Sequence, residues 1–88
     1  MKTTELSNRA EENKTAKYID LATNFFNEAR EIFINNKSFI LKMACDHAFE
    51  HFEKAKNADC EYTAYINTFG CETILNKMKN YLITKRYE

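Results

Sequence analysis

The chain contains no proline and only one glycine, Gly70, among its 88 residues. Because these two residue types mark many of the turns in small proteins, few loops are expected. Apolar residues recur at spacings of three and four, which is the period of an amphipathic helix and not of a strand. The sequence therefore predicts an all-α protein, and its short connections favour a compact antiparallel bundle of three to four helices.

Two polar segments divide the chain. Asparagine tolerates the left-handed conformation that ends many helices, so Asn35-Asn36-Lys37 predicts a helix end, with Ser38 capping the next helix. Asn57-Ala58-Asp59 predicts a second break, with Asp59 as the following cap. We expect a flexible N-terminus at 1–7 and a single domain at 8–88, whose helices span 8–35, 38–57, 59–69 and 71–86.

The apolar face of residues 59–87 changes sides near Phe69-Gly70. At 100° per residue, one cluster of large side chains precedes the glycine and a second follows it on nearly the opposite side. The first holds Tyr62, Tyr65, Ile66 and Phe69, and the second Ile74, Leu75, Met78 and Leu82. Because one straight helix cannot turn both clusters to one core, Gly70 is expected to end a helix. If the helix instead continues, one cluster must be exposed and available to a partner.

The core faces can be assigned from the same period. Helix 8–35 is expected to bury an arc of roughly 160°, wider than the usual stripe. A homodimer is one explanation for this width, since a second copy could cover part of the face. The expected core comprises Tyr18, Ile19, Leu21, Ala22, Phe25, Phe26, Ala29, Ile32, Phe33, Ile40, Leu41, Ala44, Cys45, Ala48, Phe52, Ala55, Tyr62, Ile66 and Phe69, with Tyr65 as the candidate exposed contact.

Charge and cysteine content limit the classes of function. Thirteen basic and thirteen acidic residues give a net charge of zero, which argues against a general nucleic-acid coat. Residues 43–72 carry −4 and residues 73–87 carry +4, a polarity that could orient a partner. Three cysteines without a CxxC pair indicate reduced thiols in a cytoplasmic protein. No apolar run approaches membrane-spanning length, so we expect no membrane partner.

One short motif is typical of metal chemistry. His47-Ala48-Phe49-Glu50-His51 matches H-x-x-E-H, in which two histidines four residues apart can share one metal ion. A working site also needs a third protein ligand, and the motif has only three fixed positions. We therefore expect ordinary amphipathic histidines, no resident metal and no cofactor, with His47 and His51 kept as candidate ligands.

The C-terminal segment is basic and aromatic. It could contact phosphates and stack tyrosines on bases, although lysines that solvate an outer helix face explain the same pattern. Together with Tyr65, its residues are the candidate partner-binding residues. They are Lys77, Lys79, Tyr81, Lys85, Arg86 and Tyr87, of which Lys85 and Arg86 are expected in the last turn of helix 71–86.

The sequence thus favours a small non-enzymatic protein-binding module that regulates or inhibits a larger macromolecule, with a larger protein as partner. Broad apolar faces, many aromatic residues and polarised charge support this reading. Its Lys-, Asn-, Ile- and Tyr-rich composition would suit an AT-rich phage or mobile-element genome. Three alternatives remain: a nucleic-acid-binding regulator that uses the basic C-terminal helix, an oligomeric small-ligand-binding protein, and a metal site at His47 and His51.

Overall fold

The computed structural model describes the backbone of residues 2–88 and the side chains of residues 14–88. It contains three helices, α1 (Lys2–Asn36), α2 (Phe39–Lys56) and α3 (Glu61–Thr84), and no strand among the described residues. Each helix contacts the other two. The expectation of an all-α bundle of three to four helices is confirmed.

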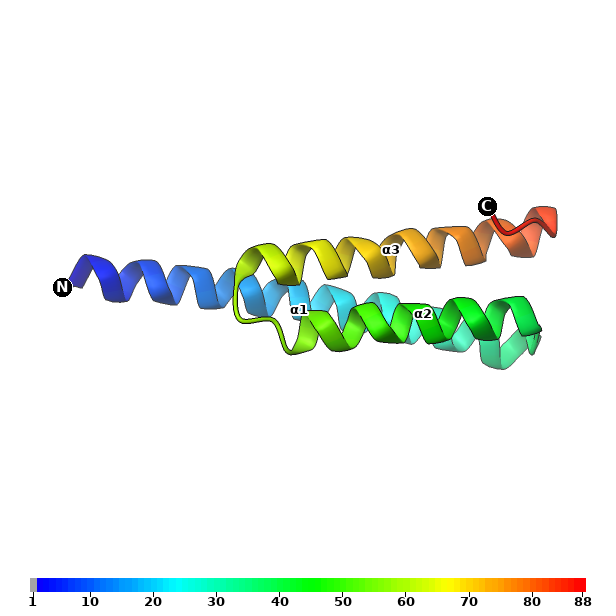
Figure 1. The fold of residues 1–88 in the computed structure, drawn as a ribbon, viewed down its shortest axis with the longest axis horizontal. Coiled ribbons are helices and arrows are strands. Elements are labelled where there is room, and N and C mark those ends of the chain that lie inside the picture. The colour runs from blue at the N-terminus through cyan, green and yellow to red at the C-terminus, as the bar shows by residue number, and fades with distance from the viewer. Residues whose placement is uncertain (1) are drawn as a thin grey trace.

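The two loops set the arrangement of the bundle. In Figure 1 the ribbon reverses direction between α1 and α2 and again between α2 and α3. The loop that joins α1 to α2 and the C-terminal end of α3 consequently lie at the same end of the molecule (Figure 1). Residues far apart in the sequence, around 37 and around 84, therefore lie at one end of the bundle.

The expected break at Gly70 is wrong. α3 runs without interruption from Glu61 to Thr84, and Gly70 lies inside it without a positive φ. A single buried stripe continues through both halves of the helix at spacings of three and four. It contains Ala64, Thr68, Cys71, Leu75 and Met78. Small and polar residues form the first half of this stripe, and the larger side chains lie on the other side of the helix, which is why the apolar pattern predicted a break.

The three core assignments that depended on this break are also wrong. Tyr62, Ile66 and Phe69 are 71%, 41% and 58% exposed. They lie on the side of α3 opposite the buried stripe, because the helix passes Gly70 without turning. The alternative expectation, in which a continuous helix exposes one apolar cluster, describes the structure. Tyr65, expected to be exposed, is half exposed.

The helix boundaries differ in detail from those expected. α1 begins at Lys2 and not near residue 8. The side chains of residues 1–13, which include the expected flexible segment 1–7, lie outside the described residues. Ser38 precedes α2 with extended backbone, but its side chain makes no capping hydrogen bond. The residue at the cap of α3 is Cys60 and not Asp59, and the Cys60 Sγ lies 3.2 Å from the Thr63 Oγ1.

The C-terminus corrects another expectation. Lys85 and Arg86 do not form the last turn of a helix, because α3 ends at Thr84 and Lys85 adopts the left-handed conformation with φ 61°. The Lys85 backbone N–H donates to the Tyr81 carbonyl at 2.8 Å. The Arg86 backbone N–H donates to the Thr84 Oγ1 at 3.1 Å. The chain thereby leaves the helix and turns back, as Figure 1 shows.

On α1 and α2, most of the buried side chains are small, which allows the helices to approach closely. Two of the core assignments there are wrong, since Leu21 is 36% exposed and Ile40 is 41% exposed. The buried apolar residues are Ala22, Ala29, Leu41, Ala44, Cys45, Ala48, Ala55, Ala64, Cys71, Ile74, Leu75 and Met78. Half-buried aromatic side chains such as Phe25 and Phe52 pack against them. None of the described helices combines the length and the apolarity that crossing a membrane requires.

Candidate functional site

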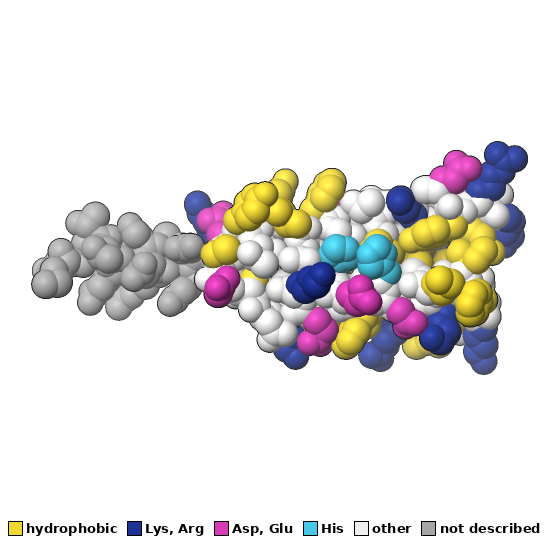
Figure 2. Space-filling view, in the orientation of Figure 1, with side chains coloured by type: hydrophobic (Ala, Val, Ile, Leu, Met, Phe, Trp, Pro, Cys, Tyr) yellow, Lys and Arg dark blue, Asp and Glu magenta, His cyan; other side chains and the backbone are white. Residues whose placement is uncertain are grey.

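Four large side chains form an exposed surface on the first half of α3. We call Tyr62, Tyr65, Ile66 and Phe69 the α3 aromatic face. Between 41% and 71% of each residue is exposed, and their positions i, i+3, i+4 and i+7 place them in one row along the helix. In Figure 2 hydrophobic side chains gather along the upper edge of the molecule, over this part of α3. Exposed apolar clusters on a small protein often mark interaction sites.

The part of α3 that carries the aromatic face is fixed to α1 by two contacts. The Thr68 hydroxyl donates to the Tyr18 carbonyl of α1 at 2.9 Å, and Thr68 itself is buried. The rings of Tyr18 and Tyr65 meet edge to face with centroids 5.4 Å apart, a favourable aromatic arrangement. Because α3 is fixed to α1 at this level, the exposed side chains project from a rigid backbone.

The charges near this face have one sign along the sequence. Residues 57–76 contain Asp59, Glu61 and Glu72 and neither lysine nor arginine. Glu61 also lines a surface pocket together with Tyr18, Tyr62 and Tyr65. Along α3 and the loop before it, the charged side chains that flank the face are therefore acidic.

The two histidines of the H-x-x-E-H motif differ in their surroundings. Their rings lie 5.0 Å apart on α2, but His51 packs against α3 whereas His47 is exposed. The His51 Nδ1 lies 3.0 Å from the Asn67 Oδ1, and the Asn67 Nδ2 donates to the Thr63 carbonyl at 2.9 Å. The Asn67 Oδ1 therefore accepts, and His51 carries its proton on Nδ1. This ring joins α2 to α3.

A metal site at these histidines finds no third ligand in the described part of the chain. No group of three or more His, Cys, Asp or Glu side chains there could hold a metal ion. The His51 Nδ1 is instead hydrogen-bonded to the Asn67 Oδ1 at 3.0 Å. The expectation that no metal resides here stays a prediction, and the geometry gives the alternative no support.

Two of the three free cysteines, Cys45 and Cys71, are buried thiols. Burial raises the pKa of the Cys71 thiol to about 11, and its Sγ donates to the Ala48 carbonyl at 3.4 Å. Burial, together with the nearby Asp46 carboxylate, also raises the pKa of Cys45. Since the thiolate is the nucleophile, both of these cysteines remain unreactive thiols at neutral pH. Cys60 is half buried.

The basic C-terminal residues lie far from Tyr65. About twenty residues of α3 separate Tyr65 from Lys85, a distance of roughly 30 Å at 1.5 Å per residue. The structure therefore does not bring the expected partner-binding residues together. Lys77, Lys79, Lys85 and Arg86 are exposed, and Tyr81 and Tyr87 are half buried.

Several of these C-terminal residues also have partners inside the molecule. The Lys79 Nζ lies 3.2 Å from the Glu28 carboxylate of α1. Tyr81 and Tyr87 pack against the core, and the Lys77 Nζ lies 5.9 Å from the centre of the Tyr87 ring. The two tyrosines that the nucleic-acid alternative would need for stacking on bases thus pack against the fold.

The favoured sequence interpretation placed three members of the α3 aromatic face, Tyr62, Ile66 and Phe69, in the core, and only its alternative exposed them. A usable signal was nevertheless present. Counting back from Leu82 in steps of three and four passes Met78, Leu75, Cys71, Thr68 and Ala64 without a break. That stripe identifies the inward face of one continuous helix, and the larger residues on the other side are then exposed.

Comparison with protein-family models, curated proteins and solved structures finds no match to this chain. Its functional assignment therefore rests on the geometry described above.

Proposed function

We propose that this chain is a small non-enzymatic protein-binding module, an antiparallel bundle that presents the α3 aromatic face to a larger protein. In this proposal the four exposed side chains insert into an apolar groove of the partner. Occupation of that groove would regulate or inhibit the partner by excluding its other ligands.

The observation that carries this proposal is the spacing of the exposed residues. Positions i, i+3, i+4 and i+7 are those that an amphipathic helix uses when it lies in a hydrophobic groove. Tyrosine and phenylalanine also supply large contact areas with little loss of side-chain entropy, because each has only two rotatable side-chain bonds. Tyr62, the most exposed of the four at 71%, would undergo the largest burial.

Preorganisation supports the same reading. A free helical peptide loses conformational entropy when it orders on binding, whereas the bundle already fixes α3 through the Thr68 and His51 contacts. The acidic residues Glu61 and Asp59 next to the face favour a groove with lysine or arginine at its rim. The partner is thus proposed to be a protein with an apolar groove and a basic border.

The geometry favours this function over two of the three alternatives. Nucleic-acid binding through the C-terminal segment would need tyrosines free to stack, and Tyr81 and Tyr87 pack against the core. A metal site would need a third ligand beside His47 and His51. For the metal site, no observation on the described residues adds support.

The proposal can be tested with two double variants, each of which replaces two exposed apolar residues. Tyr62→Ser with Phe69→Ser removes the two most exposed members of the face. Phe39→Ser with Ile83→Ser removes two exposed apolar residues elsewhere on the bundle, and serves as the control. Each protein is used as bait in the native cell, and captured proteins are quantified by mass spectrometry. The purified partner is then titrated against each variant.

We expect the first variant to lose a partner that the unmodified protein and the control retain. Since helix-face anchors often contribute 2 kcal/mol or more on truncation, the affinity should fall by roughly thirtyfold or more. Circular dichroism must show that both variants keep their helix content. A partner that binds both double variants equally well would contradict the proposal, as would the lack of any specific partner.

A further inference from the structure

A second exposed apolar surface lies at the opposite end of the bundle from the start of α3. Here the loop Lys37–Ser38 and the C-terminal end of α3 lie at the same end of the molecule (Figure 1), and we call this region the hairpin end. Phe39 is 74% exposed, Ile83 82% and Met43 59%. Ile34 lines a pocket with Phe39 at the same loop. Three different helices therefore place large apolar side chains in water at one end.

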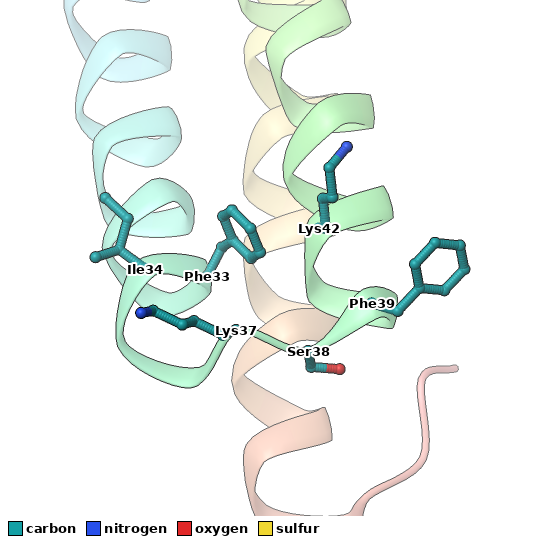
Figure 3. A pocket seen from close by; sticks show the side chains of 6 residues that line it. All are labelled: Phe33, Ile34, Lys37, Ser38, Phe39 and Lys42. Carbon is teal, nitrogen blue, oxygen red and sulfur yellow. The ribbon is translucent and has the colours of Figure 1, made fainter.

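Two phenylalanines on either side of the loop between α1 and α2 differ in orientation. In Figure 3 Phe33 points toward the space between α1 and α2, whereas Phe39 points away from the bundle. Phe33 is half buried and packs against the core. Phe39, the first residue of α2, has no such role, although its exposed ring is unfavourable in water. The exposed Phe39 ring is therefore available to contact another molecule or a surface.

The hairpin end is also the basic end of the protein. Residues 30–43 and 77–88, which lie within roughly 10 Å of this end at 1.5 Å per residue, contain seven basic and two acidic residues, a net charge of +5. Since the whole chain is neutral, the rest carries −5. Lys42 and Lys79 form exposed ion pairs with Asp46 and Glu28. Outside those pairs the region keeps five basic and two acidic residues.

Folding brings these charges together. Lys37 lies in the first loop and Lys85 directly after α3, and both have left-handed backbone conformations with φ of 47° and 61°. Arg86 follows Lys85 and is exposed. Figure 2 shows lysine and arginine side chains around a group of hydrophobic side chains at this end. The surface thus combines an apolar centre with a basic border.

We propose that the hairpin end docks on the surface of a lipid bilayer that contains anionic lipid. Phe39 and Ile83 enter the boundary between headgroups and acyl chains, while Lys37, Lys85 and Arg86 contact the anionic headgroups. Peripheral membrane surfaces use this combination of apolar insertion and attraction between basic residues and acidic lipid. The sequence expectation of no membrane partner rested on the lack of a membrane-spanning segment, and this proposal departs from it because surface docking needs no such segment.

The composition of the hairpin end favours lipid over two other occupants. Nucleic acid binds through aromatic side chains that stack on bases, but the most exposed residues here include the aliphatic Ile83 and Met43. A second copy would bring two ends of net charge +5 against each other, and like charges at close range oppose association. Anionic lipid satisfies both the apolar and the basic parts of this surface.

Vesicle binding tests this inference directly. The chain contains no tryptophan, so Phe39→Trp provides a single fluorescent reporter in the full-length protein. It is titrated with vesicles of phosphatidylcholine, alone or mixed with phosphatidylserine, at low and high salt. Co-sedimentation compares the unmodified protein with Phe39→Ser/Ile83→Ser and Lys85→Glu/Arg86→Glu. The Tyr62→Ser/Phe69→Ser variant is the control, because its substitutions lie at the other end of α3.

We expect a blue shift with phosphatidylserine vesicles that high salt reduces, and little shift with phosphatidylcholine alone. Each hairpin-end double variant should bind anionic vesicles about tenfold more weakly or worse, while the Tyr62/Phe69 control binds normally. Failure to bind anionic vesicles overturns the inference, as does equal binding to both vesicle types. Two further results would replace it: competition by duplex or single-stranded DNA, or a dimer in light scattering that Phe39→Ser/Ile83→Ser abolishes.

This inference is independent of the proposed protein partner. The two surfaces lie at opposite ends of α3 and share no residue. Loss of vesicle binding in the hairpin-end variants would leave capture of a protein partner intact, and the reverse holds for the Tyr62/Phe69 variant. Failure of either proposal is therefore distinguishable from failure of the other.

Discussion

The imidazole of His51 occupies the space that a side chain at Gly70 would need. A Cβ built on Gly70 lies 2.8 Å from both the Cγ and the Nδ1 of His51. The same ring hydrogen-bonds to Asn67 one turn earlier on α3. The only glycine in the chain thus has a packing role inside a helix, where it lets α2 approach α3, and it makes no turn.

Gly70→Ala should destabilise the fold, by about 1–3 kcal/mol, because the added methyl group overpacks the contact with His51. In an unobstructed helix interior the same change would gain about 1 kcal/mol through helix propensity. The His51 Cγ is one bond from its Cβ, so the ring can move aside only by changing rotamer and losing Asn67. Urea unfolding measures the effect, and the His51→Ala/Gly70→Ala double variant is the control. A more stable Gly70→Ala single variant would show that the helices separate at little cost.

The two histidines should differ in their contribution to stability. His51→Ala leaves the buried Asn67 Oδ1 without its partner and should cost about 1–3 kcal/mol. His47→Ala, one turn away on the exposed side, should change the free energy of unfolding by about 0.5 kcal/mol or less. Chemical denaturation compares the two variants. Nitrogen-15 shifts of the His51 ring at neutral pH should show a proton on Nδ1, and the opposite tautomer would contradict the hydrogen bond described here.

Native-state alkylation should distinguish the three thiols. Cys60 is half buried, whereas Cys45 and Cys71 are buried with raised pKa values. Because the reagent needs an accessible thiolate, iodoacetamide should modify Cys60 first. Cys45 and Cys71 should react mainly after the protein opens, so urea should equalise the three rates. Mass spectrometry of tryptic peptides follows each site. Early modification of Cys71 in the native protein would be inconsistent with this packing.

The pKa of Cys71 predicts how stability changes in alkaline solution. Burial raises it to about 11, against an ordinary value of 9.0. Below pH 9 the thiol is protonated in both folded and unfolded states, so its contribution is fully present. As the pH rises from 9 to 11 the unfolded state loses the proton first, and stability declines. The decline attributable to this group is at most about 2–3 kcal/mol.

Cys71→Ala isolates that contribution, since other groups also titrate above pH 9. The variant should be less stable at neutral pH because its side chain fills less of the core. Its free energy of unfolding should nevertheless fall less steeply between pH 9 and 11 than that of the unmodified protein. Parallel slopes for the two proteins would show that Cys71 is solvated or ionised in the folded state.

The helical character of the fold was readable from the sequence. The absence of proline and the spacing of apolar residues restricted the chain to helices, and Asn36-Lys37 and Asn57 marked the two real breaks. Most of the core on α1 and α2 followed from the same period, because large and small apolar residues there share one face. These properties are local: each depends on residues within a few turns of one another.

The orientation of α3 could be decided only by tertiary packing. The side of its first half that faces α1 and α2 carries Ala64, Asn67, Thr68 and Cys71, all smaller than the exposed Tyr62 and Phe69, and two of them are polar. Small residues allow close approach of the helices, and Asn67 and Thr68 find hydrogen-bond partners on α2 and α1. The sequence determined which segments are helices. The fit of small and hydrogen-bonded side chains across the helix interfaces determined which face was buried, and so which aromatic residues reached the surface.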